Sequence, residues 1–155
     1  MLDRDLARVS YEHYITGASA INWISDDAET GGWHRLNYFD SGMVKVALAG
    51  IHYPDTRRYF GSYGVINDTA RFESLGVDVL GRQVYVASHY RAAADIVLKW
   101  AISSAVQCSV EISDWFPRQP HVDELVALFE AGKQRLEEDY LWKRVQGWLS
   151  TQITT

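Results

Sequence analysis

The sequence predicts an α+β fold, in which an antiparallel sheet built from hairpins is packed on one face by helices. Three observations predict this class. Apolar and polar residues alternate in two pairs of neighbouring segments, with turn residues inside each pair. Residues 89–107 are apolar around most of a helical turn, and residues 121–149 repeat apolar positions at helical spacing. The chain of 155 residues is long enough for a core of its own, so residues 1–155 are expected to form a single globular domain.

The N-terminal part of the chain is predicted to hold a short helix and a first hairpin. Apolar positions recur every three or four residues over 2–15, which predicts a helix. Alternation predicts two strands within 33–51, because the turn residues Asp40, Ser41 and Gly42 lie between them.

A second hairpin is predicted over 77–88. The apolar-polar segments 77–80 and 83–88 flank Gly81 and Arg82. A type II′ turn has glycine at its first central position, and Gly81 occupies that position. Residues between the two hairpins lack a clear period.

Residues 89–107 predict a mostly buried central helix. Its polar residues form one narrow stripe, with Arg91, Asp95, Lys99 and Ser103 at strict four-residue spacing. A helix that is polar on one stripe only is mostly buried. Asp95 and Lys99 stand in the favourable order for an ion pair between adjacent turns.

The rest of the chain is predicted to be mainly helical. Residues 108–112 resemble one more strand, and residues 114–120 are a connection because they contain two prolines. Helical periodicity over 121–149 predicts C-terminal helices, which Gly132 either divides or weakens. A frayed C-terminal tail is expected at about 150–155.

Charge and cysteine content limit the classes of function that the sequence supports. The net charge is −5, and the Lys and Arg residues are scattered, which disfavours non-specific nucleic-acid binding. The same acidity suits a partner protein with a basic surface. Cys108 is the sole cysteine, so it is interpreted as core packing and no internal disulfide forms. A charged N-terminus and the lack of long apolar runs predict a soluble, cytoplasmic protein with no membrane contact.

The segment 51–64, "IHYPDTRRYFGSYG", is the best candidate for a binding site. Arginine binds anions through a planar fork, and Tyr, Trp and Arg are enriched in binding hot spots. Two interpretations remain open, a site and a packed connection whose arginines pair with local acids. The predicted binding residues are Tyr53, Arg57, Arg58, Tyr59, Phe60 and Tyr63 here, and Trp115 and Phe116 in the connection at 114–120.

The favoured hypothesis is a non-enzymatic intracellular protein that acts through protein–protein contact. Inhibitors, immunity proteins and phage antagonists share its size and composition. The sequence contains no motif for a metal site or a cofactor, and it names no catalytic residue. A homodimer is a compatible possibility, with Trp142 and Trp148 at the interface.

The alternative hypothesis is a small enzyme that acts on an anionic or phosphorylated substrate. Arg57 and Arg58 would then clamp the anion. His34 or His52, together with Asp55, would transfer protons.

Overall fold

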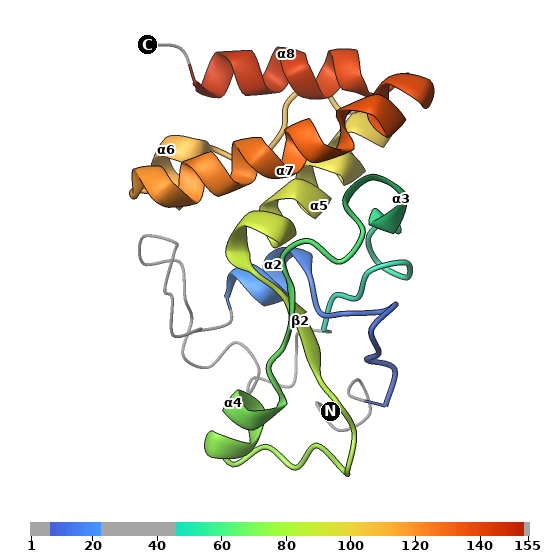
Figure 1. The fold of residues 1–155 in the computed structure, drawn as a ribbon, viewed down its shortest axis with the longest axis vertical. Helices are drawn as coiled ribbons and strands as arrows, with labels where there is room; N and C mark the ends of the chain where they lie inside the picture. Colours follow the sequence, from blue (N-terminus) through green and yellow to red (C-terminus); the bar gives the residue numbers. More distant parts are fainter. Residues whose placement is uncertain (1–6, 23–45, 154–155) are drawn as a thin grey trace.

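The computed structural model describes residues 7–22 and 46–153, which form seven helices and one two-stranded sheet (Figure 1). In chain order the elements are α2 (Gly17–Ile21), α3 (Arg57–Phe60), β1 (Val65–Asn67), α4 (Thr69–Ser74), β2 (Tyr85–Ala87), α5 (His89–Ile102), α6 (Ile112–Trp115), α7 (Gln119–Glu138) and α8 (Trp142–Gln152). The predicted α+β class is confirmed, and the two strands pair antiparallel. No helix in the described part of the chain is both long and apolar enough to cross a membrane.

The predicted central helix is α5, which lies between the sheet and the C-terminal helices (Figure 1). It follows β2 directly, and Ser88 caps it by accepting a hydrogen bond from the Arg91 amide. α2 and β2 pack on α5, and so do α7 and α8. The core therefore has two clusters that meet at α5, one around the sheet and one among the C-terminal helices. The helix ends at Ile102, earlier than the predicted residue 107.

Of the hairpin predicted over 77–88, only the second strand forms, and it pairs with a different strand. β2 lies where the second strand was expected, but it pairs with β1, and Val65 lies opposite Ala87. Residues 77–80 form no strand, because β1 already pairs with β2 and these residues lead back to β2 from α4 (Figure 1). The alternation of apolar and polar residues over 77–80 instead reflects burial of an apolar side chain, since Val79 is only 6% exposed.

Most of the first predicted hairpin, residues 33–45, lies outside the described residues. The residues that follow pair with the N-terminal segment. The amide of Thr16 donates to the carbonyl of Ala47, and the amide of Ala49 donates to the carbonyl of Tyr14. Strand-like pairing at 46–49 is thus present, with residues 14–16 as the partner.

The helix predicted over 2–15 is wrong for the described residues 7–15, which form turns and an extended end. Ile15 bridges Leu48 on one side and Val86 on the other, and its own side chain is 0% exposed. Bridging on two sides requires an extended backbone, so tertiary pairing overrides the local helical pattern.

The predicted C-terminal helices are confirmed as α7 and α8. The chain turns between them after Glu138, whereas Gly132 lies inside α7. α8 extends to Gln152, past the start of the tail expected to fray. The Gln152 side chain explains this, because its oxygen accepts a hydrogen bond from the Ile112 amide at 2.9 Å.

The strand predicted over 108–112 is absent, and its last residue begins α6 instead. Val110 and Ile112 are buried against the helices, so their apolar character reflects core contact rather than strand pairing.

Candidate functional site

Residues 51–64 form a packed connection with an exposed outer side. The segment leaves a turn at 48–53, continues through α3 and joins β1. Thr56 is 0% exposed and Phe60 is 5% exposed, because α3 packs on α7. The inner side is therefore part of the core, and only the outer side is placed to contact a partner.

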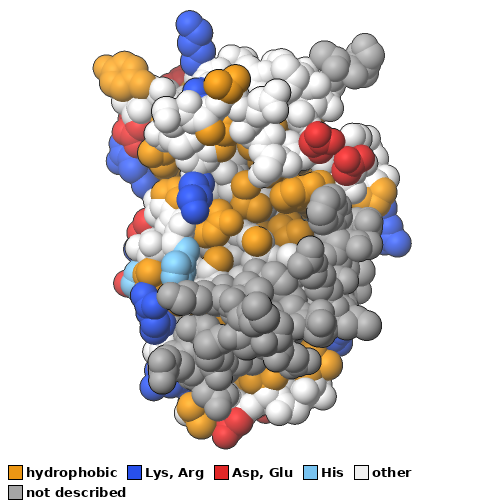
Figure 2. Space-filling view, turned by 180° about the vertical axis from the view of Figure 1, so that it is seen from behind, with side chains coloured by type: hydrophobic (Ala, Val, Ile, Leu, Met, Phe, Trp, Pro, Cys, Tyr) orange, Lys and Arg blue, Asp and Glu red, His pale blue; other side chains and the backbone are white. Residues whose placement is uncertain are grey.

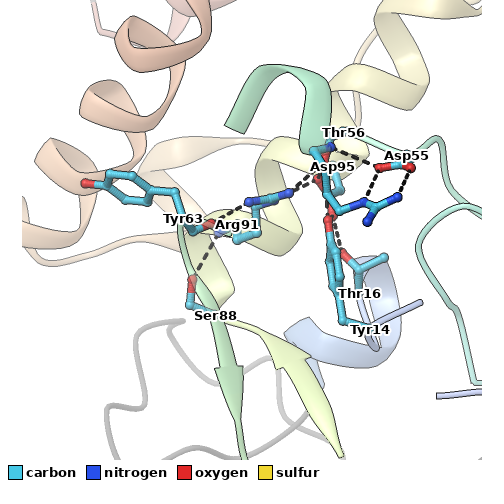
Figure 3. A network of polar contacts seen from close by, with 9 residues as sticks. Tyr14, Thr16, Asp55, Thr56, Tyr63, Ser88, Arg91 and Asp95 are labelled. Atoms are coloured by element: carbon cyan, nitrogen blue, oxygen red, sulfur yellow. Dashed lines mark hydrogen bonds and ion pairs between the residues drawn. The ribbon is translucent and has the colours of Figure 1, made fainter. Parts of the chain in front are cut away.

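A fully buried ion pair fixes the inner side of this segment (Figure 3). Arg91 Nε and Asp95 Oδ1 are 3.3 Å apart on adjacent turns of α5, and neither side chain is exposed. Asp95 accepts hydrogen bonds from the hydroxyls of Thr16 and Thr56 at 2.6 Å each, and of Tyr14 at 2.8 Å. Burial raises the pKa of Asp95, and Arg91 and the three hydroxyls oppose that shift. The network joins three segments that are distant in sequence.

Aromatic rings and a backbone carbonyl complete the surroundings of Arg91. Its guanidinium carbon is 5.3 Å from the ring centroids of both Tyr14 and Phe60. Its Nη1 donates to the Tyr63 carbonyl, and its Nη2 donates to the Thr56 hydroxyl at 3.1 Å. The segment 51–64 is thus attached to α5 through Arg91 as well as through Asp95.

The predicted pair between Asp95 and Lys99 does not form. Asp95 points into the core, whereas Lys99 is exposed and donates to the His52 carbonyl at 3.1 Å. The Lys99 Nζ lies 4.5 Å from the ring centroid of Tyr53, which is half-buried. Lys99 therefore covers a predicted binding residue rather than neutralising the buried acid.

Arg57 is occupied by a local carboxylate. Its Nε donates to Asp55 Oδ1 at 3.0 Å, and its Nη2 donates to Oδ2 at 2.7 Å. This bidentate pair holds the pKa of Asp55 below its usual range. Glu12 Oε1 is also 3.8 Å from the guanidinium. An anionic substrate would have to displace these carboxylates.

Arg58 and Tyr59 brace the C-terminal end of α7. Arg58 Nε and Nη2 donate to the two carboxylate oxygens of Asp139 at 2.7 and 3.0 Å. The Tyr59 hydroxyl donates to Asp139 Oδ2 at 2.6 Å. These hydrogen bonds lower the pKa of Asp139, and burial together with the same bond raises the pKa of Tyr59 to about 12. The segment 51–64 therefore fixes Asp139, the capping residue that follows α7.

The next residue, Tyr140, is the most exposed aromatic side chain among the described residues, at 93%. Its φ of 62° lies in the left-handed region, which favours glycine. The Tyr140 amide donates to the Glu137 carbonyl, and the Leu141 amide donates to the Leu136 carbonyl. These bonds form a Schellman motif, in which glycine usually occupies the position of Tyr140.

A shallow groove of about 280 Å³ lies beside Tyr140. It is lined by Glu137, Tyr140, Trp142 and Lys143. The Lys133 ammonium lies 5.4 Å from the centroid of Trp142, whose ring is otherwise nearly buried. Tyr140 thus stands beside a groove with a tryptophan in its wall.

We use the name α7–α8 corner for this surface, which comprises Arg58, Glu137, Asp139, Tyr140, Trp142 and Lys143. In the view of Figure 2, the corner of the molecule where α7 meets α8 carries acidic, basic and hydrophobic side chains together.

The remaining predicted binding residues differ in exposure. Tyr63 is 38% exposed, and its hydroxyl donates to Glu124 at 2.8 Å. Trp115 is partly buried and contacts both core clusters. Phe60 and Phe116 are 5% and 2% exposed, so these two are core residues with no surface to offer a partner.

The residues of the enzyme hypothesis have other partners. His34 lies outside the described residues. His52 Nδ1 accepts a hydrogen bond from the Leu48 amide at 3.0 Å, which requires that nitrogen to be unprotonated. Asp55 is engaged by Arg57. The occupied carboxylate weighs against the proposed acid–base pair of His52 and Asp55.

Within residues 7–22 and 46–153, no three His, Cys, Asp or Glu side chains group as metal ligands. Cys108 is half-buried, and burial raises the pKa of its thiol. A raised pKa leaves less of the reactive thiolate near neutral pH.

Sequence reasoning missed Tyr140, although a signal for it exists. The acidic run Glu137, Glu138 and Asp139 ends a helical pattern with no glycine after it. Glycine or asparagine usually occupies the left-handed position that follows a helix, and here the residue is tyrosine.

The contact between Arg58 and Asp139 predicts a dependence of stability on pH. Because the folded protein lowers the pKa of Asp139, its ionised form contributes stability above the ordinary value of about 4. That contribution is lost as the pH falls through the lowered value. We therefore expect Asp139→Asn to destabilise the protein near neutral pH and to have a smaller effect at about pH 3, below the ordinary pKa.

Urea unfolding of both proteins at the two pH values measures this difference. Glu130→Gln, at an exposed acid on the same helix, is the control and should show no such dependence. An Asp139→Asn effect of equal size at both pH values would contradict the prediction.

Comparison with known protein families, with curated proteins and with solved structures finds no match for this chain.

Proposed function

We propose that this protein is a non-enzymatic binding protein that contacts another protein through the α7–α8 corner. The observation that carries the proposal is the placement of Tyr140, which is 93% exposed and held at a φ of 62°. Tyrosine is among the residues that dominate binding energy at interfaces, because one ring provides a large contact area.

Backbone strain supports a role for the Tyr140 side chain. A left-handed conformation costs a residue other than glycine about 1–2 kcal/mol. This side chain does not pack in the core, because it is almost wholly in solvent. Strain at an exposed residue with no structural contact motivates a functional hypothesis.

Rigidity of the corner supports the same proposal. Asp139, next to Tyr140, is held by Nε and Nη2 of Arg58 and by the Tyr59 hydroxyl. Leu141, on the other side, is fixed by its amide bond to Leu136. A surface that is already ordered loses less conformational entropy on binding, which favours affinity.

The net charge and the pairing of the arginines favour a partner protein with a basic surface. With a net charge of −5, the protein would associate faster with a protein that presents a basic surface. The carboxylates that occupy Arg57 and Arg58 favour contact with a protein over capture of a small anion. A cytoplasmic location, which the single cysteine favours, belongs to this proposal.

Tyr140→Gly tests the proposal without loss of the fold. Glycine adopts positive φ freely, so we expect the free energy of unfolding to rise by about 0.5–1 kcal/mol. We expect the variant to lose the partner that the wild-type protein captures from lysate of its native host. Loss of binding by a more stable protein excludes unfolding as the cause.

Leu80→Gly is the matched control, because Leu80 is the other described residue besides glycine with positive φ and is 55% exposed. It should gain similar stability and keep the partner. A partner retained by Tyr140→Gly would move the binding site away from the α7–α8 corner. Capture of no partner by any of the three proteins would count against the proposed function.

A further inference from the structure

Two charges beside Tyr140 have no ion pair within the described part of the chain. Glu137 and Lys143 both line the groove, and both are exposed. Neither side chain makes a hydrogen bond or ion pair with another described residue. The two acids that follow Glu137 in the chain, Glu138 and Asp139, are by contrast both paired with Arg58. The opposite charges at the groove are therefore available to a second molecule.

The groove carries a side chain of each charge sign, so two copies of it can complement one another. Glu137 lies in the last turn of α7, Lys143 lies in the first turn of α8, and Tyr140 lies between them. A two-fold axis through the groove exchanges the two ends of such a surface. It would bring Glu137 of one copy to Lys143 of the other, and each Tyr140 to the apolar wall formed by Trp142.

We propose that in the free protein a second copy of the chain covers the α7–α8 corner, as a two-fold symmetric dimer. The inference rests on the proposed function in that it assigns a first occupant to the same surface. Where the dimer forms, it covers Tyr140, and the other protein competes with the second copy for the same surface. Since the groove is small, the dimer is weak and forms only at high protein concentration.

Sedimentation equilibrium of four proteins tests the dimer: the wild type, Glu137→Lys, Lys143→Glu and the double reversal. Each single reversal places like charges across the axis, so we expect the dissociation constant to rise by about tenfold. The double reversal restores opposite charges and should restore the dimer to nearly wild-type strength. Glu130→Lys, an exposed reversal outside the groove, should leave it unchanged.

The outcomes separate this inference from the proposed function. A wild-type protein that stays monomeric from micromolar to submillimolar concentration would overturn the dimer, while Tyr140-dependent capture of another protein could still succeed. A dimer that single reversals leave intact, or that the double reversal fails to restore, would overturn this interface. Circular dichroism of each variant confirms that it is folded before it is compared.

Discussion

Asp95→Ala is expected to lower the free energy of unfolding by about 3–5 kcal/mol, the largest effect of any single change considered for this protein. Removal of the carboxylate leaves the buried guanidinium of Arg91 without a counter-charge. It also leaves the hydroxyls of Tyr14, Thr16 and Thr56 without their shared acceptor. Urea unfolding, followed by circular dichroism, measures the loss.

A double-mutant cycle separates the charge from the packing. Arg91→Met keeps an apolar chain between the rings of Tyr14 and Phe60 while it removes the charge. We expect the double variant with Asp95→Ala to be less destabilised than the sum of the single variants, because no unpaired buried charge remains. A cost below about 1 kcal/mol for Asp95→Ala would show that Arg91 finds water or another partner.

Gly132→Ala is expected to destabilise the protein by about 1–2 kcal/mol, although alanine normally stabilises a helix. A Cβ at Gly132 would lie 2.9 Å from Phe60 Cε1 and 3.0 Å from the backbone oxygen of Tyr59. The backbone atom cannot rotate away, so α3 would have to shift from α7. Because α3 carries Arg58, the brace on Asp139 would weaken as well.

Gly147→Ala is the matched control. Gly147 lies inside α8, and a Cβ there would meet open space. We therefore expect the free energy of unfolding to rise by about 0.5–1 kcal/mol, the usual difference between alanine and glycine in a helix. The same substitution thus has opposite signs at two helical glycines. Stabilisation at both positions would mean that α3 and α7 do not approach as closely as the structure shows.

Two different kinds of contact hold the segment 51–64 in place, one buried and one at the surface. The buried network of Arg91 and Asp95 attaches the segment 51–64 to α5. The surface contact of Arg58 with Asp139 attaches the same segment to α7. The segment identified from its rings and arginines is therefore a support for the α7–α8 corner, whose exposed aromatic residue is Tyr140.

The sequence by itself determined the α+β class, the central helix that begins at 89, and the helices of the C-terminal third; the end of the central helix, predicted at 107, lies at Ile102. These depend on apolar periodicity, which is local and which burial of one helical face enforces. The pair of Arg57 with Asp55 agrees with one of the two interpretations that the sequence left open, a packed connection whose arginines pair with local acids.

Only the tertiary structure decided the pairing of β2 with β1, the extended path of residues 14–16 and the partners of the buried and surface arginines. Asp95 meets Tyr14 across 81 positions of sequence, and Arg58 meets Asp139 across the same separation. No local pattern specifies such contacts, because they exist only after the core has brought distant segments together. The exposure of Tyr140 has the same origin: the contact of Arg58 with Asp139 holds the turn that places its ring in solvent.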